Sequence, residues 1–363
     1  MKPIDELLAE MKTRNASDLH LKAGSPPVLR IDGELSLMDQ PPMTPEDTKD
    51  VAASIMTDKQ IRRFSEHNEI DFAYSVPDLG RFRVNVFRQR GSISIAMRQV
   101  ATKVPSFEEL HLPEIIKRIA LEPRGLTLVT GTTGSGKTTT LAAMIDHINS
   151  QMRRHIVTIE DPIEVLHKDR KSIINQREIG LDSDSYATAL KYVLRQDPDV
   201  ILIGEMRDTE TVQAALTAAQ TGHFVMSTLH TIDATETINR IIDFFPPHQQ
   251  KQVRIMLAGT LKAIISQRLL VRADGQGRVP AVEIMICTNR IRDFILDPEQ
   301  AHLVHDAIAE GDFYGMQTFD QALLKLYEDN MITLSDAASV AANPHDFKLL
   351  VQQQGYDVSL MTF

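Results

Sequence analysis

The chain has 363 residues, of which 42% are hydrophobic and 24% charged, and its formal net charge is −10. Its length allows two domains, and its acidic balance argues against a general nucleic-acid binder, which would have a surplus of Lys and Arg. The single cysteine, Cys287, excludes an intrachain disulfide and the common cysteine-based zinc sites, which fits a reducing compartment. The charged N-terminus is not typical of a signal peptide, and no apolar run approaches the ~18 residues of a membrane span, so we expect no direct membrane insertion.

Residues 1–98 predict a small α+β domain. Segments whose apolar residues have helical spacing and segments with strand alternation follow one another, separated by turn signals. Two of the predicted helices each have a threonine near the start that is suited to cap them. The predicted elements are helices at 3–12, 44–56 and 57–67 and strands at 17–22, 27–35, 70–77, 81–89 and 92–100.

The rest of the chain has a different pattern. Residues 99–113 contain two prolines and little periodicity at their start, so we place a linker there. From 114 to 288, short apolar runs alternate with helical patterns, which indicates an α/β core with a parallel sheet and helices on both faces. Residues 289–363 are predicted to be a helical C-terminal region.

The strongest motif is GTTGSGKT at 131–138, which fits G-x-x-x-x-G-K-[ST] and lies between a short apolar strand and a helical pattern. Its glycines let backbone N–H groups point at phosphate oxygens, and the helix N-terminus adds partial positive charge. We expect Lys137 to reach the β and γ phosphates of a nucleotide and Thr138 to offer a hydroxyl to Mg²⁺. The predicted nucleotide-binding residues are Gly131, Thr132, Thr133, Gly134, Ser135, Gly136, Lys137, Thr138 and Thr139.

Glu205 follows the apolar run at 200–203 and so lies at the carboxyl end of a predicted strand, where ligands bind in open α/β sheets. Gly204 occupies the place where many P-loop enzymes have a metal-binding aspartate. We therefore interpret Glu205 as the residue that polarises an attacking water, and the alternative is a surface glutamate at a strand end.

Two further polar clusters adjoin predicted strands. Glu160, Asp161 and Glu164 would repel one another beside a phosphate site unless Mg²⁺ or a positive partner is present. His223 precedes a strand and His230 follows it, where a neutral imidazole could sense a γ-phosphate or act as a proton relay. A solvated acidic turn and structural histidines are the alternatives.

With these blocks in view, the chain resembles the type IV pilus retraction (twitching motility) ATPases of the PilT and PilU kinds, in the secretion ATPase superfamily. The resemblance covers nearly the whole chain. It rests on the phosphate loop GTTGSGKT, the Asp box TIEDPIE, the Walker B block LRQDPDVILIGEMRD and the His box TGHFVMSTLHT, in that order. SDLHL, GRFRVNVF and GMQTFDQAL are also similar to segments of this family.

The resemblance implies a cytoplasmic homohexamer of RecA-like ATPase domains that binds ATP and Mg²⁺, each domain being joined to a PAS-like N-terminal domain. It implies that Glu205 is the catalytic glutamate, that Glu164 is the Asp-box glutamate and that His230 is the His-box residue nearest the nucleotide. It also implies that the protein is peripheral at the inner face of the cytoplasmic membrane. The implied partners are an inner-membrane pilus platform protein and, as a further candidate, a paralogous retraction ATPase. Hydrolysis would withdraw pilin subunits into the membrane.

Two absences favour the retraction branch of this superfamily. Extension-type and type II secretion ATPases usually have an extra N-terminal domain and a four-cysteine zinc site, whereas here the phosphate loop begins at Gly131 and one cysteine is present. The retraction motif AIRNLIRE corresponds to NRIRDFILD at 289–297, which departs from it at Leu296 and Asp297, and FDQAL and IIDFFPP resemble the PilU kind. The sequence leaves the choice between the two kinds open.

Two other functions remain open at this point. A RecA-like ring could translocate nucleic acid, although the acidic composition and the absence of Trp argue against an aromatic platform for single strands. The chain could also be a catalytically weak accessory ring subunit, although it has Lys137, Thr138, Glu164 and Glu205.

Four arginines lie within residues 81–90 of this acidic chain. Strand alternation places Arg83 on a polar face, and a two-residue turn at Arg90–Gly91 would bring it opposite Arg98. Like charges directly across a hairpin are destabilising, so the pair makes better sense if an anion docks there, and a solvated polar face is the alternative. The resemblance implies that Arg83 and Arg98 face the γ-phosphate bound by a neighbouring subunit.

Overall fold

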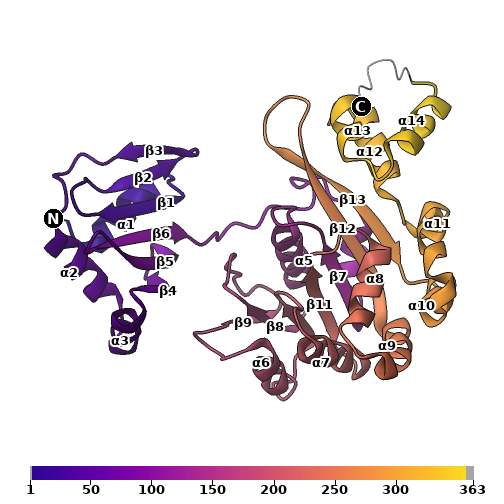
Figure 1. The fold of residues 1–363 in the computed structure, drawn as a ribbon, viewed down its shortest axis with the longest axis horizontal. Helices are drawn as coiled ribbons and strands as arrows, with labels where there is room; N and C mark the ends of the chain where they lie inside the picture. The colour runs from indigo at the N-terminus through magenta and orange to yellow at the C-terminus, as the bar shows by residue number, and fades with distance from the viewer. Residues whose placement is uncertain (1, 357–363) are drawn as a thin grey trace. The chain divides into compact units, whose positions relative to one another are not determined.

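The computed structural model describes residues 2–356. The chain divides into two compact units, each with its own sheet and core (Figure 1). The N-terminal unit comprises Met1–Lys103 with Glu164–Leu166, and the larger unit comprises Val104–Ile163 with His167–Phe363. The division at Lys103 falls inside the segment where the sequence predicts a linker.

The N-terminal unit is built on a six-stranded antiparallel sheet with the order β3-β2-β1-β6-β5-β4. Its strands are β1 (Asp18–Lys22), β2 (Val28–Ile31), β3 (Glu34–Leu37), β4 (Glu69–Val76), β5 (Gly80–Gln89) and β6 (Ser92–Gln99). Its helices are α1 (Ile4–Thr13), α2 (Pro45–Ile55) and α3 (Asp58–His67). The helices bury their apolar faces against alternate strand residues, which form one core.

Local sequence signals account for most of these elements. Thr44 and Thr57 cap α2 and α3 with complete capping boxes, as their positions predict. The single strand expected over 27–35 is wrong, because β2 and β3 are separated by a tight turn. Asp32 and Gly33 have φ angles of 49° and 88° there, the conformation that an Asp-Gly pair favours in a two-residue hairpin.

The larger unit contains a seven-stranded sheet with the order β13-β12-β7-β11-β10-β8-β9. Its strands are β7 (Gly125–Thr130), β8 (His155–Glu160), β9 (Ile173–Glu178), β10 (Val200–Ile203), β11 (Phe224–Leu229), β12 (Leu261–Val271) and β13 (Arg278–Ile286). The pairs from β12 to β9 are parallel, as expected, but β13 runs antiparallel to β12. The fully parallel sheet is therefore a wrong prediction at this edge, since a short loop can join only antiparallel neighbours.

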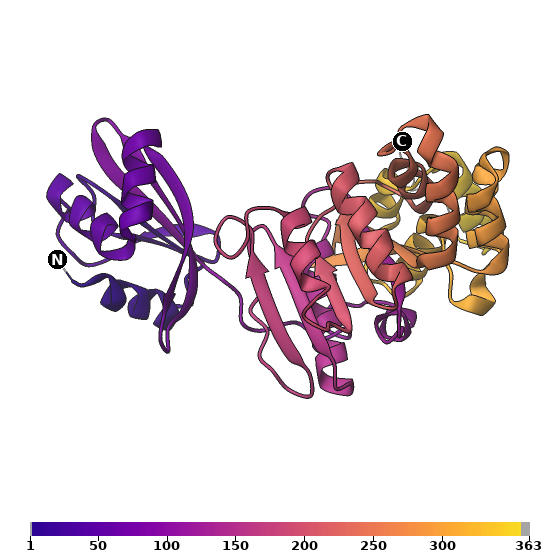
Figure 2. The same ribbon diagram turned by 90° about the horizontal axis from the view of Figure 1, so that it is seen from below.

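Helices cover both faces of this sheet, as the alternation of strands and helices predicts (Figure 2). They are α4 (Ile115–Ala120), α5 (Lys137–Gln151), α6 (Tyr186–Val193), α7 (Thr209–Gln220), α8 (Ala234–Asp243) and α9 (Pro247–Thr260). Val129 and Leu202 point towards α4 and α5, whereas Leu128 and Ile203 point towards the core shared by α6 to α9. Strands buried on both faces explain the continuous apolar runs in the sequence.

The chain after β13 is helical, as expected. Its elements are α10 (Asn289–Leu296), η1 (Pro298–Leu303), α11 (Val304–Ala309), η2 (Asp312–Tyr314), α12 (Phe319–Glu328), α13 (Leu334–Val340) and α14 (Pro344–Gln353). The last three helices pack in a separate cluster against Leu270, Val279 and Ala281 of the β12–β13 hairpin. Among residues 2–356, no helix combines the length and the apolar character that crossing a bilayer requires.

Candidate nucleotide site

The phosphate loop connects β7 to α5 in the predicted strand–loop–helix order. Gly131, Gly134 and Gly136 have φ angles of 140°, 80° and 94°, which L side chains rarely adopt. A Cβ atom on Gly131 would lie 2.5 Å from the backbone oxygen of Gln267, so only glycine lets the loop pass this close to β12. The glycines therefore allow the loop to curve and to pack closely against the sheet.

Lys137 is buried at the start of α5 and closes the loop on itself. Its Nζ donates hydrogen bonds to the carbonyl oxygens of Gly131 at 2.7 Å and Thr132 at 2.9 Å. The neighbouring Thr138 is exposed in the first turn of the helix, and Thr132 and Thr133 are exposed at the tip of the loop. The ammonium group and the Thr138 hydroxyl thus flank backbone N–H groups at a helix N-terminus, which is an anion-binding arrangement.

Gln267 of β12 is a residue of this site that the sequence analysis missed. Its Nε2 donates to Thr140 Oγ1 at 2.8 Å in the interior. Within the described part of the chain, its Oε1 and the hydroxyl of Ser135 are buried and have no hydrogen-bond partner. Both residues line a cavity of about 250 Å³ beside the loop, together with Leu110, Leu269 and Pro280. Buried polar atoms without partners are rare, so these two are candidates for contact with a ligand.

Glu205 lies at the end of β10 and contacts His230 at the end of the neighbouring β11. The distance between Glu205 Oε1 and His230 Nε2 is 3.1 Å, and Glu205 Oε2 accepts a hydrogen bond from Arg207 at 2.8 Å. Hydrogen bonding to Glu205 is the main cause of the raised pKa of Arg207. The structure thus brings together two of the predicted catalytic residues, and Arg207 is a contact that the sequence analysis did not consider.

Gly204 has a steric reason to be glycine. A Cβ atom there would lie 2.9 Å from the hydroxyl oxygen of Tyr186 and 3.2 Å from the backbone oxygen of Ile159. An aspartate at this position would need these neighbours to move. The space beside β10 is occupied by Tyr186, whose burial raises the pKa of its hydroxyl.

The three acidic residues at the end of β8 and just after it have different surroundings. Glu160 is buried and accepts hydrogen bonds from Thr158 at 2.6 Å and Gln176 at 3.1 Å. Asp161 is exposed and lies 3.9 Å from Arg207. Glu164 is exposed and belongs to the segment that is compact with the N-terminal unit. The alternative interpretation, a solvated acidic turn, is therefore wrong for Glu160, whose side chain is buried and held by hydrogen bonds.

His223 and His230 also differ. His223 Nδ1 lies 2.9 Å from the carbonyl oxygen of Ala218 and 3.1 Å from Thr221 Oγ1, so this ring binds the end of α7 and fits the structural alternative. His230 is 47% exposed and faces Glu205.

The arginines of the N-terminal unit pair as the alternation predicts. Arg90 and Gly91 form the two-residue turn between β5 and β6, and Arg83 is the direct register partner of Arg98. The structure adds a partner that the sequence analysis missed, because Arg98 Nε donates to the buried Asp18 of β1 at 2.7 Å. Burial raises the pKa of Asp18, but hydrogen bonds from Ser17 and Arg98 outweigh this and lower it overall. One of the two arginines is therefore neutralised within the unit.

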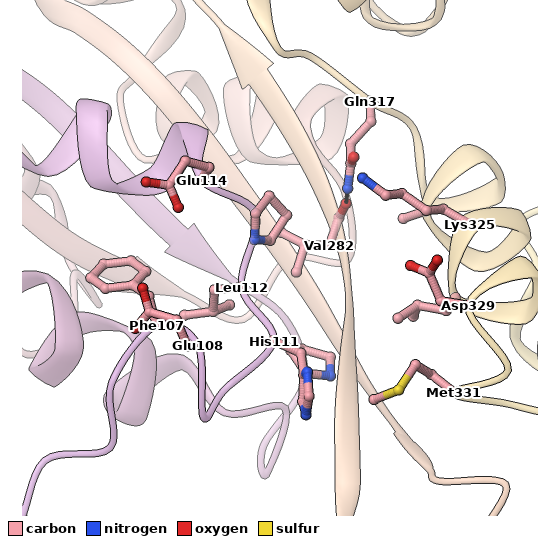
Figure 3. Close-up of a pocket in the computed structure, with 14 residues that line it drawn as sticks. Phe107, Glu108, His111, Leu112, Glu114, Val282, Gln317, Lys325, Asp329 and Met331 are labelled. Carbon is pink, nitrogen blue, oxygen red and sulfur yellow. Dashed lines mark hydrogen bonds between the residues drawn. The ribbon is translucent and has the colours of Figure 1, made fainter.

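A second cavity of about 460 Å³ lies in the larger unit (Figure 3). It is lined by the segment around His111, by Val282 of β13, by Lys325 of α12 and by Asp329 just after that helix. None of the predicted site residues lines it.

The phosphate loop on a mainly parallel sheet, with Glu205 and His230 at the ends of neighbouring strands, defines a P-loop ATPase with a RecA-like core. The strand order places β11 between β7 and β10, so that His230 follows the strand between the loop and Glu205. The chain belongs to the type II/IV secretion system protein family, whose model matches residues 1–330.

Individual relatives cover nearly the whole chain. The type IV pilus retraction ATPase PilT of Pseudomonas aeruginosa is 46% identical over 344 residues, which are 95% of this chain and 99% of the relative. The type IV pilus ATPase PilU of the same organism is 42% identical over 348 residues, which are 96% of this chain and 91% of the relative.

Solved structures agree with these relatives. A crystal structure of the pilus retraction motor PilT with bound ADP has a TM-score of 0.88 and 48% identity, and the match covers 95% of this chain and 99% of that one. The ATPase DotB of Legionella pneumophila has a TM-score of 0.80 and 28% identity, with 97% of this chain and 96% of that one covered. The expected fold class, a RecA-like α/β core with a smaller PAS-like N-terminal domain and a helical C-terminal region, is confirmed.

Proposed function

We propose that this protein is a hexameric motor ATPase whose hydrolysis of ATP drives retraction of a type IV pilus. The observation that supports this most directly is the complete phosphate loop together with the Glu205–His230 contact, in a chain 46% identical to a retraction ATPase over 95% of its length. The match covers 99% of that relative.

The geometry of the site supports the chemistry that we assign to it. Lys137 and the loop amides hold the phosphates, and the exposed Thr138 hydroxyl is the protein ligand for Mg²⁺. No group of three or more His, Cys, Asp or Glu side chains within residues 2–356 could hold a metal by itself, which fits an ion that is bound mainly by substrate phosphates and water. When bound, Mg²⁺ would supply positive charge that offsets the negative charge of the nucleotide phosphates.

Glu205 is the residue that we propose orients the attacking water. His230, 3.1 Å from this carboxylate, is placed to fix its orientation and to respond to the γ-phosphate. We assign Glu164 of the Asp box to the same reaction on the family pattern. The nucleoside is proposed to occupy the 250 Å³ cavity beside the loop, where Leu269 and Pro280 offer apolar contacts and Gln267 offers a polar one.

Arg83 and Arg98 are proposed to act on the nucleotide of a neighbouring subunit. Their side chains are exposed on one face of the hairpin, and arginines supplied to a phosphoryl group in this way are worth ~10³–10⁵ in rate. The homohexamer is therefore part of the proposal. Its partners are an inner-membrane platform protein at the cytoplasmic face of the membrane and a paralogous retraction ATPase.

Phosphate release by wild type and by Glu205→Gln tests the enzymatic part. We expect a loss of at least ~100-fold, because orientation of water is removed while nucleotide binding is kept. His223→Gln is the matched control, since that ring binds the end of α7, and it should keep most of the activity. Equal and low release by wild type and Glu205→Gln would instead indicate an accessory ring subunit.

A strain that lacks this protein tests the biological part. Abundant surface pili without twitching motility would support retraction. Loss of pili would instead indicate a role in pilus assembly and would contradict the proposal.

A further inference from the structure

Glu283 is a buried acid that the mechanism above does not use. It lies in the middle of β13, opposite Ser266 of β12, and only 3% of its surface is exposed. Its Oε1 accepts a hydrogen bond of 2.8 Å from the backbone N–H of Ala234. Burying a carboxylate is costly, so the contact with Ala234 calls for an explanation beyond packing.

Ala234 is the first residue of α8, and the loop just before it contains His230. The loop is fastened to the first turn of the helix by side chains. Thr231 Oγ1 lies 2.6 Å from Thr237 Oγ1, and the N–H of Ile232 donates to Glu236 Oε2 at 2.9 Å. A short and continuous series of contacts therefore runs from Glu283 through the start of α8 to His230, and from there to Glu205.

The charged groups that face Glu283 come from three elements. They are Asp233, which caps α8, Arg268 of β12 and Asp320 of α12. Burial raises the pKa of Glu283 to about 7, although the hydrogen bond from Ala234 opposes this. A group with such a pKa changes its charge as the pH passes through about 7.

Two of these neighbours also hold the C-terminal helices on the sheet. Arg268 donates to the carbonyl oxygen of Val340 and lies 4.0 Å above the ring of Phe319. Asp320 accepts a hydrogen bond of 3.0 Å from the N–H of Ala342. The charged environment of Glu283 thus depends on how α12 and α13 pack against the sheet.

We infer that Glu283 is a positioning residue, which holds the first turn of α8 and thereby fixes the loop that orients His230 against Glu205. This inference rests on the proposed function of that pair. A hydrogen bond to an ionised carboxylate is stronger than one to a neutral acid, so the loop is held more firmly when Glu283 is charged. Turnover should then rise with pH through the range near 7.

Two substitutions separate positioning from simple packing. Glu283→Gln keeps the shape of the side chain and a hydrogen-bond acceptor but cannot ionise. We therefore expect turnover at pH 7 within about threefold of wild type, and we expect the rise of kcat with pH near 7, the pH step, to disappear. Glu283→Leu removes the acceptor, and we expect kcat to fall roughly tenfold while KM for ATP stays within about twofold, because the phosphate loop is not touched.

Asp320→Asn is the companion variant. It removes an acidic neighbour without touching Ala234, so the pH step of kcat should move to lower pH and remain present. This variant also covers the case in which Glu283→Leu does not fold, since it and Glu283→Gln keep the shape of the interior. A pH profile of kcat that is unchanged in both Glu283→Gln and Asp320→Asn would overturn the inference.

Hydrogen exchange gives a readout that does not depend on catalysis. In the nucleotide-free protein, amides at 231–237 should exchange faster in Glu283→Leu than in wild type or Glu283→Gln. Unchanged exchange there, or a rise in KM as large as the fall in kcat, would contradict a positioning role. If Glu205→Gln hydrolyses ATP as fast as wild type, the proposed function fails, whereas the exchange result still decides whether Glu283 holds the loop.

Discussion

At the scale of single residues, the surroundings of Glu205 explain an unusual neighbour. Gly204 stands where an aspartate is common in P-loop enzymes, and the hydroxyl of Tyr186 fills the space that its side chain would need. The carboxylate that we propose orients the attacking water, that of Glu205, follows one residue later and lies 3.1 Å from His230. A side chain at position 204 would therefore need Tyr186 or the backbone at Ile159 to shift.

We predict that Gly204→Ala destabilises the protein by about 1–3 kcal/mol, the usual cost of overpacking a tight interior. Its Cβ atom would lie 2.9 Å from the oxygen of Tyr186, so adding Tyr186→Phe should restore part of the loss. Urea unfolding of both single variants and the double variant measures this coupling. Strictly additive effects would show that the tyrosine is not the obstacle.

His167 gives a prediction about pH. Burial lowers the pKa of its ring to about 4 from an ordinary value of 6.5, and its Nδ1 has no hydrogen-bond partner within the described residues. The unfolded chain therefore takes up a proton first as the pH falls. The stabilising contribution is present above pH 6.5 and is lost as the pH falls towards 4, by about 3 kcal/mol in total.

His167→Gln should therefore reduce the difference in free energy of unfolding between pH 7 and pH 4. Urea titrations at the two pH values measure it. The exposed His248 of α9 provides the control, and His248→Gln should leave the difference as in wild type. An unchanged difference in His167→Gln would mean that this ring does not control acid stability.

At the scale of elements, the β5–β6 hairpin shows how an unfavourable pair is tolerated. Arg83 and Arg98 are register partners, and the buried Asp18 on the next strand binds Arg98 at 2.7 Å. The sheet order β1-β6-β5 thus places the Asp18 carboxylate on one side of Arg98 and Arg83 on the other. Arg83 remains exposed on the same face, where an anion from outside the unit can reach it.

We predict that Asp18→Asn destabilises the N-terminal unit by about 2 kcal/mol, because a charged hydrogen bond is lost and two like charges are left opposite each other. Arg83→Gln in the same chain should recover part of this loss, while Arg83→Gln alone should be nearly neutral. The shift of the urea unfolding midpoint, measured at low and high salt, reports both effects. A loss that is independent of salt and of Arg83 would contradict the electrostatic explanation.

The elements also show where prediction from sequence ended. Continuous apolar runs identified β7, β10 and β11, and threonine caps identified α2 and α3, because these signals are local. The sequence does not predict β12 and β9, and it predicts one strand where the structure has β2 and β3. Gln267 was missed because its role depends on β12 lying beside the phosphate loop, a contact between residues more than a hundred positions apart.

At the scale of the whole molecule, the proposed function divides the site between two subunits. The phosphate loop, Glu205 and His230 belong to the larger unit, whereas Arg83 and Arg98 belong to the N-terminal unit. If arginines act on a neighbour's nucleotide, hydrolysis requires assembly. Activity per subunit should therefore rise with protein concentration, and a fully active monomer would contradict this.

Mixing inactive subunits tests the same point more sharply. Lys137→Ala lacks the phosphate-binding ammonium but keeps its arginines, and Arg83→Ala keeps the phosphate loop. We predict that each is weakly active alone and that mixed rings recover a measurable part of wild-type phosphate release, because some interfaces then contain both intact halves. Lys137→Ala mixed with Glu205→Gln is the control and should recover nothing, since every phosphate site there is defective.

The sequence by itself determined the class of this protein, since the phosphate loop, the strand-end Glu205 and His230 and the turn at Arg90–Gly91 are encoded by neighbouring residues with fixed local geometry. Tertiary structure alone decided that β13 runs antiparallel, that Tyr186 excludes a side chain at Gly204, that Asp18 neutralises Arg98 and that Glu283 holds the start of α8. Each of these facts depends on which distant segments the folded sheet brings together, and such contacts leave no periodic or local pattern in the chain.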